Sequence, residues 1–133
     1  MASYFCNCGE NQANFELCLK NNVAGFPSTG YQTGDLVFLI VKINSRWNLG
    51  ARGTLLESTN NKPWNDADNY KSSFKANWEP INKQDVTEGL RKIYHPNFGL
   101  AIQGKKDINT FQNKGDELKE FFNNFFITST LLK

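Results

Sequence analysis

The chain has 133 residues, of which 39% are hydrophobic and 21% are charged, and its net charge is +2 at pH 7. This size and composition predict that residues 1–133 form a single domain with its own core. The sequence has no run of the about 18 apolar residues that a membrane helix needs, and so small a positive charge does not by itself indicate nucleic-acid binding. The first residues lack the basic and then apolar order of a signal peptide, so we expect a cytoplasmic protein with reduced cysteines and no membrane partner.

The first elements predicted along the chain are a strand over 3–8 and a helix over 12–21, which the side chain of Asn11 can cap. Residues 25–34 hold proline and glycine breakers and predict a loop. The next strand, over 35–43, is continuously apolar and rich in β-branched residues, which indicates burial on both faces.

The second half begins with a turn at 44–46 and a strand over 47–58, in which Gly50 and Gly53 indicate the bulge or bend that a barrel requires. Further predicted elements are a strand over 72–80, a short helix near 85–92, an extended segment over 98–103 and a helix over 116–126. The order of elements predicts an α+β fold around a curved sheet.

Motifs for catalysis or metal binding are missing from the sequence. It contains no phosphate-binding loop, no nucleophile elbow and no His-Glu-x-x-His pattern. Cys6 and Cys8 share one face of the first strand, but a zinc site would need further ligands, and Cys18 and His95 fit no standard spacing. We therefore expect no enzyme activity, no cofactor and no metal site.

The loop before the strand over 72–80 is the most informative segment, because Trp64 and Tyr70 lie there among asparagine, aspartate and lysine. Two aromatic rings in a polar loop can wall a slot for a flat ligand such as a base, and each base stack is worth about 1–3 kcal/mol. The alternative is that these rings pin the loop onto the fold. Phe74 and Trp78, four residues apart on the strand, are predicted to be core.

Basic residues beside this loop are candidates for contact with a nucleic-acid backbone. Trp47, at a predicted hairpin tip next to Arg46, is either a wedge that props open a duplex or a residue that packs on its own hairpin. The predicted backbone-binding residues are Arg46, Trp47, Lys62, Lys71, Lys75, Lys105 and Lys106.

Three segments, residues 34–41, 44–55 and 64–85, resemble in their order and spacing the YTH/EVE branch of the PUA-like superfamily. The resemblance implies a small twisted β-barrel flanked by helices, with a pocket that holds a flipped, modified base. In YTH readers, N6-methyladenine lies between aromatic walls. Here the resemblance places Trp64 and Tyr70 as two walls, where tyrosine replaces a tryptophan and the loop is one residue longer.

The resemblance places the third wall at the end of the first strand, where phenylalanine replaces the expected tryptophan. The pocket residues carried over are Phe5, Cys6, Asn7, Cys8, Trp64 and Tyr70. Asn7, or backbone groups near it, would read the base edge, because a carboxamide both donates and accepts hydrogen bonds.

Similar domains form the N-terminal specificity modules of McrB-like, modification-dependent restriction systems. The resemblance therefore implies a non-catalytic reader of a modified base in DNA, with N6-methyladenine favoured over 5-methylcytosine and an NTPase motor and a nuclease as candidate partners. One alternative is a reader of N6-methyladenosine in RNA, and another is a module that binds a protein or a small ligand. The sequence leaves open the choice between DNA and RNA, the modification, the sequence context, the oligomeric state and an attached motor.

Overall fold

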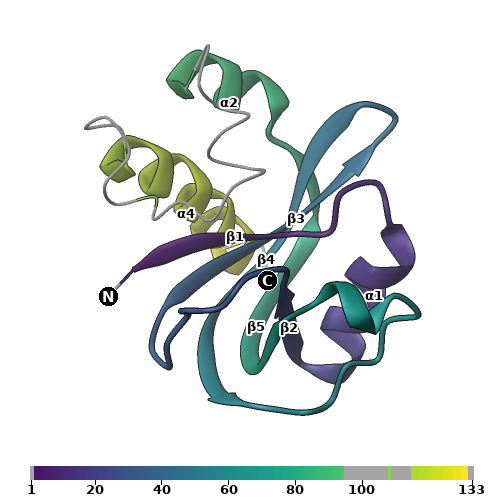
Figure 1. Ribbon diagram of the computed structural model, residues 1–133. Coiled ribbons are helices and arrows are strands. Elements are labelled where there is room, and N and C mark those ends of the chain that lie inside the picture. The colour runs from purple at the N-terminus through teal and green to yellow at the C-terminus, as the bar shows by residue number, and fades with distance from the viewer. Residues whose placement is uncertain (1, 95–107, 109–114, 132–133) are drawn as a thin grey trace.

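The computed structural model describes residues 2–94, 108 and 115–131 (Figure 1). Its strands form one sheet in the order β1-β3-β4-β5-β2, in which β1 is parallel to β3 and the other pairs are antiparallel. The strands are β1 (Ser3–Asn7), β2 (Val23–Phe26), β3 (Leu36–Ile43), β4 (Arg46–Ser58) and β5 (Ser72–Asp85). The sheet curls until its two edges meet, so that the sulfur of Cys6 on β1 lies 3.7 Å from the carbonyl oxygen of Gly25 on β2.

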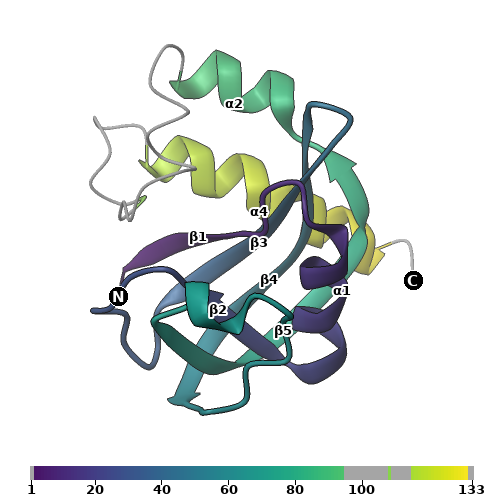
Figure 2. The same cartoon turned by 45° about the vertical axis from the view of Figure 1, so that its right-hand side comes forward.

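The helices lie on both sides of this half-barrel (Figure 2). Helix α1 (Gln12–Asn21) covers the inside, and helices α2 (Thr87–Tyr94) and α4 (Gly115–Leu131) cover the outer face. The carboxamide of Asn11 accepts a hydrogen bond from the backbone N–H of Asn14 at 2.9 Å, which confirms the predicted cap of α1. The α+β class and the curved barrel-like sheet are therefore confirmed.

Strand β3 is buried on both faces, as its continuous apolar sequence predicts. Phe38 and Ile40 belong to the core under α2 and α4, whereas Val37, Leu39 and Val41 belong to the core inside the half-barrel. Successive side chains of a strand point to opposite faces, so one strand supplies two cores.

The sequence prediction misses some boundaries. Strand β2 (Val23–Phe26) overlaps the start of the predicted loop over 25–34, because four residues are too few to show a strand pattern. Strand β5 continues past Pro80 to Asp85, since Pro80 pairs with Ala51 at a register shift in the β4–β5 ladder, where a proline is tolerated. The segment over 98–103 and His95 lie outside the described residues. No helix in the part of the chain described is long and apolar enough to cross a membrane.

The register shift beside Gly50 brings β4 close to α1, as a bulge at this glycine predicts. A Cβ at Gly50 would overlap the buried ring of Phe15 on α1. Gly50→Ala should therefore lower the free energy of unfolding by about 1–3 kcal/mol, the typical result of overpacking. Urea denaturation measures this change. Thr54→Ala at an exposed site of the same strand is the control, with an expected change of about 0.5 kcal/mol or less; equal losses in the two variants would contradict the packing.

Candidate functional site

The loop between β4 and β5 lays Trp64 and Tyr70 on the inside of the half-barrel. The side chain of Trp64 is only 3% exposed, and a Cβ built on Gly25 of β2 would lie 2.6 Å from the end of its indole. The ring centroids of Trp64 and Tyr70 are 4.6 Å apart with an interplanar angle of 40°. A base stacked between two walls needs about 7 Å, twice the contact distance of about 3.5 Å. The two rings therefore touch each other, and the slot between them is closed.

Hydrogen bonds from Asn14 of helix α1 to Asp66 and Tyr70 hold this loop to the helix, and we call this set of contacts the latch. Asn14, which is 3% exposed, donates from its Nδ2 to Asp66 Oδ1 at 3.0 Å and to the hydroxyl oxygen of Tyr70 at 2.8 Å. The Nζ of Lys62 donates to the backbone carbonyl of Tyr70 at 2.7 Å. The hydrogen bond from Asn14 lowers the pKa of Asp66, and burial together with the negative charge of Asp66 raises the pKa of Tyr70 to about 12.

Asn14 is the site residue that the sequence analysis missed. Its one signal is an asparagine in the interior of a predicted helix, where this residue is intrinsically unfavourable.

The three thiols lie together beside Trp64. Cys6 of β1 and Cys8, which directly follows β1, point toward Cys18 of α1. Hydrogen bonds from Cys6 and then Cys8 lower the pKa of Cys18, whereas donating to Cys18 and burial raise the pKa of Cys6 and of Cys8. Among the described residues no group of three or more His, Cys, Asp or Glu side chains is arranged to hold a metal ion. The thiols thus connect the aromatic loop to the first strand, close to the proposed pocket.

Two of the residues carried over for the pocket lie elsewhere. Phe5 points to the outer face, where its ring packs edge-on against Phe122 of α4 with the centroids 5.5 Å apart. The expected third wall from Phe5 is therefore wrong, because adjacent residues of a strand face opposite sides and Cys6 takes the inner side. Asn7 accepts a hydrogen bond from the backbone N–H of Gly9 at 2.7 Å, so its carboxamide oxygen stabilises the turn after β1.

The predicted backbone-binding residues are mostly engaged within the protein. Arg46 forms ion pairs with Asp85 at 2.8 Å and with Glu88 at 3.0 Å. Trp47 is 7% exposed and packs in the outer core with residues of α2 and α4, so its ring is not exposed as a wedge would be.

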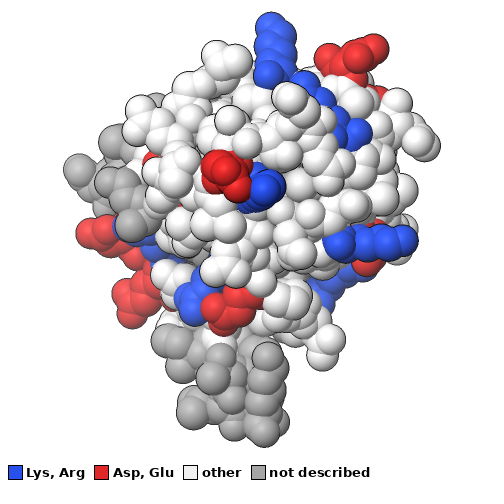
Figure 3. Space-filling view, turned by 90° about the horizontal axis from the view of Figure 1, so that it is seen from below, with Lys and Arg blue, Asp and Glu red and all other residues white. Residues whose placement is uncertain are grey.

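The lysines around the aromatic loop are no freer. Lys75 pairs with Glu57 at 2.9 Å, and Lys62 is bound to Tyr70. Of the described members of the predicted set, only Lys71 is exposed without a hydrogen-bonding or ionic partner, and Lys105 and Lys106 lie outside the described residues. Figure 3 shows a face that is largely uncharged, with its basic and acidic side chains next to one another.

Comparison of the whole structure with solved structures identifies its fold. The sequence matches no known protein family and no curated protein. A crystal structure of the Mmi1 YTH domain matches with a TM-score of 0.60 at 12% identity, over 96% of this chain and 99% of that chain. A second crystal structure of that domain gives 0.60 at 10% identity, over 95% and 90%. A complex of the YTH domain-containing protein Mmi1 with RNA gives 0.60 at 13%, over 99% and 87%. The chain thus has a YTH-like fold.

The latch predicts a specific titration. Because Asn14 donates to the carboxylate of Asp66, Asn14→Ala should raise the pKa of Asp66 toward its unfolded value of about 4. Asn69→Ala, which removes a longer hydrogen bond of 3.3 Å, should raise it less. Carboxyl-detected NMR titration measures both.

A carboxyl group whose pKa is lower in the folded than in the unfolded protein stabilises the fold at pH values above its unfolded pKa. This stabilisation is lost as the pH falls through the pKa of the folded protein. The acid-induced loss of stability should therefore be smaller in Asn14→Ala. An Asp66 pKa that is the same in wild type and Asn14→Ala would contradict the latch.

Proposed function

We propose that this protein is a non-catalytic reader of N6-methyladenosine in RNA. The observation that carries the proposal is the pair Trp64–Tyr70, two adjacent aromatic rings that a polar loop lays inside a YTH-like half-barrel. The resemblance to YTH readers assigns an aromatic cage for a methylated adenine to this loop. The departures from that pattern mean that Trp64 and Tyr70, without Phe5, supply the walls.

Binding by this pair requires the slot to open. The rings must separate from 4.6 Å to about 7 Å, and the hydrogen bonds from Asn14 to Asp66 and Tyr70 must break. Each of those bonds is worth about 0.5–1.5 kcal/mol net, whereas each new base stack returns about 1–3 kcal/mol. The released carboxamide of Asn14 can then donate to and accept from an adenine edge. Opening is thus a modest cost that two stacks offset.

The preference for methylated over unmodified adenine comes from burial of the N-methyl group. A buried methyl group contributes about 0.8 kcal/mol, which is about a fourfold preference in affinity. The inner core around Trp64 is apolar, with Cys6, Cys18 and Phe26 among its members, and an N-methyl group suits such surroundings better than an unmodified amine. An unmodified adenine would leave part of the opened slot empty or wet.

RNA is favoured over DNA for this site by two observations. One structure with this fold is a protein–RNA complex, and a role in DNA restriction has no counterpart among the comparisons. Arg46, Lys62 and Lys75, which lie in the described part of the chain, are engaged within the protein, so they offer little to the dense phosphates of a duplex. A single strand also fits because its unpaired bases need no extrusion from a stack.

The cage predicts how Trp64→Ala behaves. Loss of one stacking wall should reduce the preference for a methylated over an unmodified RNA oligonucleotide to about one, and should weaken binding to the methylated RNA by about fivefold or more. Fluorescence anisotropy with paired single-stranded RNA and DNA oligonucleotides measures both.

Two variants serve as controls for this test. Trp47→Phe, in the outer core, should keep the preference for methylated RNA. Tyr70→Phe keeps the ring and removes the hydroxyl, so it tests the cage without deleting a wall. The proposal fails if Trp64→Ala still prefers methylated RNA, and a stronger preference for methylated DNA would return the assignment to DNA.

Lys71, the exposed member of the predicted set without a partner in the described structure, gives a second prediction. Lys71→Glu should weaken methylated and unmodified RNA by the same factor and reduce the dependence of affinity on salt, because a phosphate contact carries no base information. Titrations at two salt concentrations test this. If the charge reversal alters only the methylated RNA, Lys71 does not contact the backbone.

A further inference from the structure

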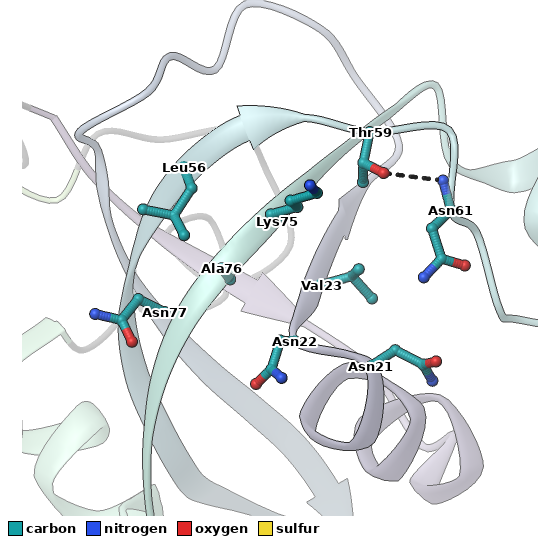
Figure 4. Close-up of a pocket in the computed structure, with 9 residues that line it drawn as sticks. All are labelled: Asn21, Asn22, Val23, Leu56, Thr59, Asn61, Lys75, Ala76 and Asn77. Atoms are coloured by element: carbon teal, nitrogen blue, oxygen red, sulfur yellow. Dashed lines mark hydrogen bonds between the residues drawn. The ribbon is translucent and has the colours of Figure 1, made fainter.

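A second hollow lies where the end of α1 meets β4 and β5 (Figure 4). Its volume is about 430 Å³, within the range of about 300–1,000 Å³ that is usual for ligand sites. The buried side chains of Val23 and Ala76 contribute to its lining. Around them lie four asparagines, Asn21, Asn22, Asn61 and Asn77. We call this hollow the asparagine groove.

Two of these carboxamides are available to a ligand. The backbone of Asn22 is fixed in the left-handed region, at φ 53°, by hydrogen bonds from its N–H to Cys18 and from Ala76 to its carbonyl oxygen. Asn77 is exposed on β5 between the buried residues Ala76 and Trp78. Within the described part of the chain, no hydrogen bond engages the side chain of Asn22 or of Asn77. Each amide therefore offers a donor and an acceptor, and hydrogen bonds hold the backbone that carries the amide of Asn22.

The groove also offers an apolar surface. Leu56 lies at the edge of the groove and is 42% exposed. Among the described residues it is the one large hydrophobic side chain that is exposed. An isolated exposed leucine is ordinary, but this one borders amides without internal partners. Lys75 beside it is paired with Glu57, so the groove carries little net charge. A flat ligand with a hydrogen-bonding edge and an apolar face matches this combination better than an anion does.

The groove adjoins a further hollow beside the loop that carries the aromatic pair. Thr59 lines both the groove and an adjoining hollow of about 340 Å³, which Lys62 and Lys71 also line. Lys62 in turn donates to the carbonyl oxygen of Tyr70. A strand with one base at Trp64 and Tyr70 and a neighbouring base in the groove would pass the exposed Lys71, so this lysine lies where a phosphate would run.

We infer that the asparagine groove binds an unmodified adenine of the same single-stranded RNA. The inference rests on the proposed function and adds a second base to it. A carboxamide pairs in bidentate fashion with N6 and N7 of adenine, and an unpaired base exposes these atoms. Leu56 packs against the face of the base, while Asn22 and Asn77 read its edge. The protein thus selects RNA in which an adenine lies near the modified nucleotide.

The test compares unmodified oligoadenylate and oligouridylate by fluorescence anisotropy. The groove variant is Asn22→Gly with Asn77→Ala, in which glycine keeps the left-handed backbone of Asn22 and removes only the carboxamide. Wild type should prefer oligoadenylate, and the groove variant should lose about fivefold or more of that affinity with little change for oligouridylate. Asn82→Ala, an exposed asparagine of β5 outside the groove, is the matched control and should stay within about twofold of wild type.

The outcomes separate this inference from the proposed function. Unchanged oligoadenylate affinity in the groove variant, or an equal loss for both RNAs, overturns the groove and leaves methyl-adenine reading at Trp64 standing. A selective loss of oligoadenylate with no preference for methylated RNA upholds the groove and overturns the cage. Failure of wild type to bind methylated or unmodified RNA overturns both.

Discussion

Burial of β3 on both faces is the constraint on which the other features of this protein depend. A strand with Phe38 and Ile40 on one side and Leu39 and Val41 on the other cannot face water, so both sides of the sheet must be covered. Helices α2 and α4 cover the outer side. On the inner side the sheet curls around its own side chains, and the small residues Gly25 and Gly50 allow Trp64 and Phe15 to come close to the backbone.

The candidate site is a consequence of how that inner core is closed. One helix is too short to cover the inside of the half-barrel, and the loop after β4 completes the cover with Trp64 and Tyr70. The aromatic pair therefore stabilises the closed fold, and in the proposed reader it must also separate to admit a base. The hydrogen bonds of Asn14 serve both requirements, closure of the core and separation of the rings, because they hold the loop without burying more apolar surface. Modest hydrogen bonds suit a contact that has to open and close.

Charge contributes less to this surface than the number of lysines indicates. Arg46 and Lys75 are paired with carboxylates, and Lys62 is bound to a backbone carbonyl. If the protein reads RNA as proposed, recognition would rest on stacking and on neutral amides, which give base specificity rather than strong attraction to phosphate. In the proposed reader, the aromatic pair would supply the stacking and the asparagine groove the neutral amides.

The sequence by itself determined the features that a few neighbouring residues encode. The apolar run of β3, the cap at Asn11 and the bulge glycine at position 50 act over one turn or one strand, so local patterns predicted them correctly. Resemblance in the order of segments extended this to the YTH-like fold. The aromatic loop was also visible in the sequence, because Trp64 and Tyr70 lie among polar and charged residues.

Only the tertiary structure decided which side chains meet. It turned Phe5 to the outer face, buried Trp47, and joined Asn14 to Asp66 across 52 residues of sequence. The four residues of β2 became a strand because β5 was there to pair with them. These outcomes depend on how distant segments pack against each other, and that information lies in the closed sheet rather than in any local stretch of the chain.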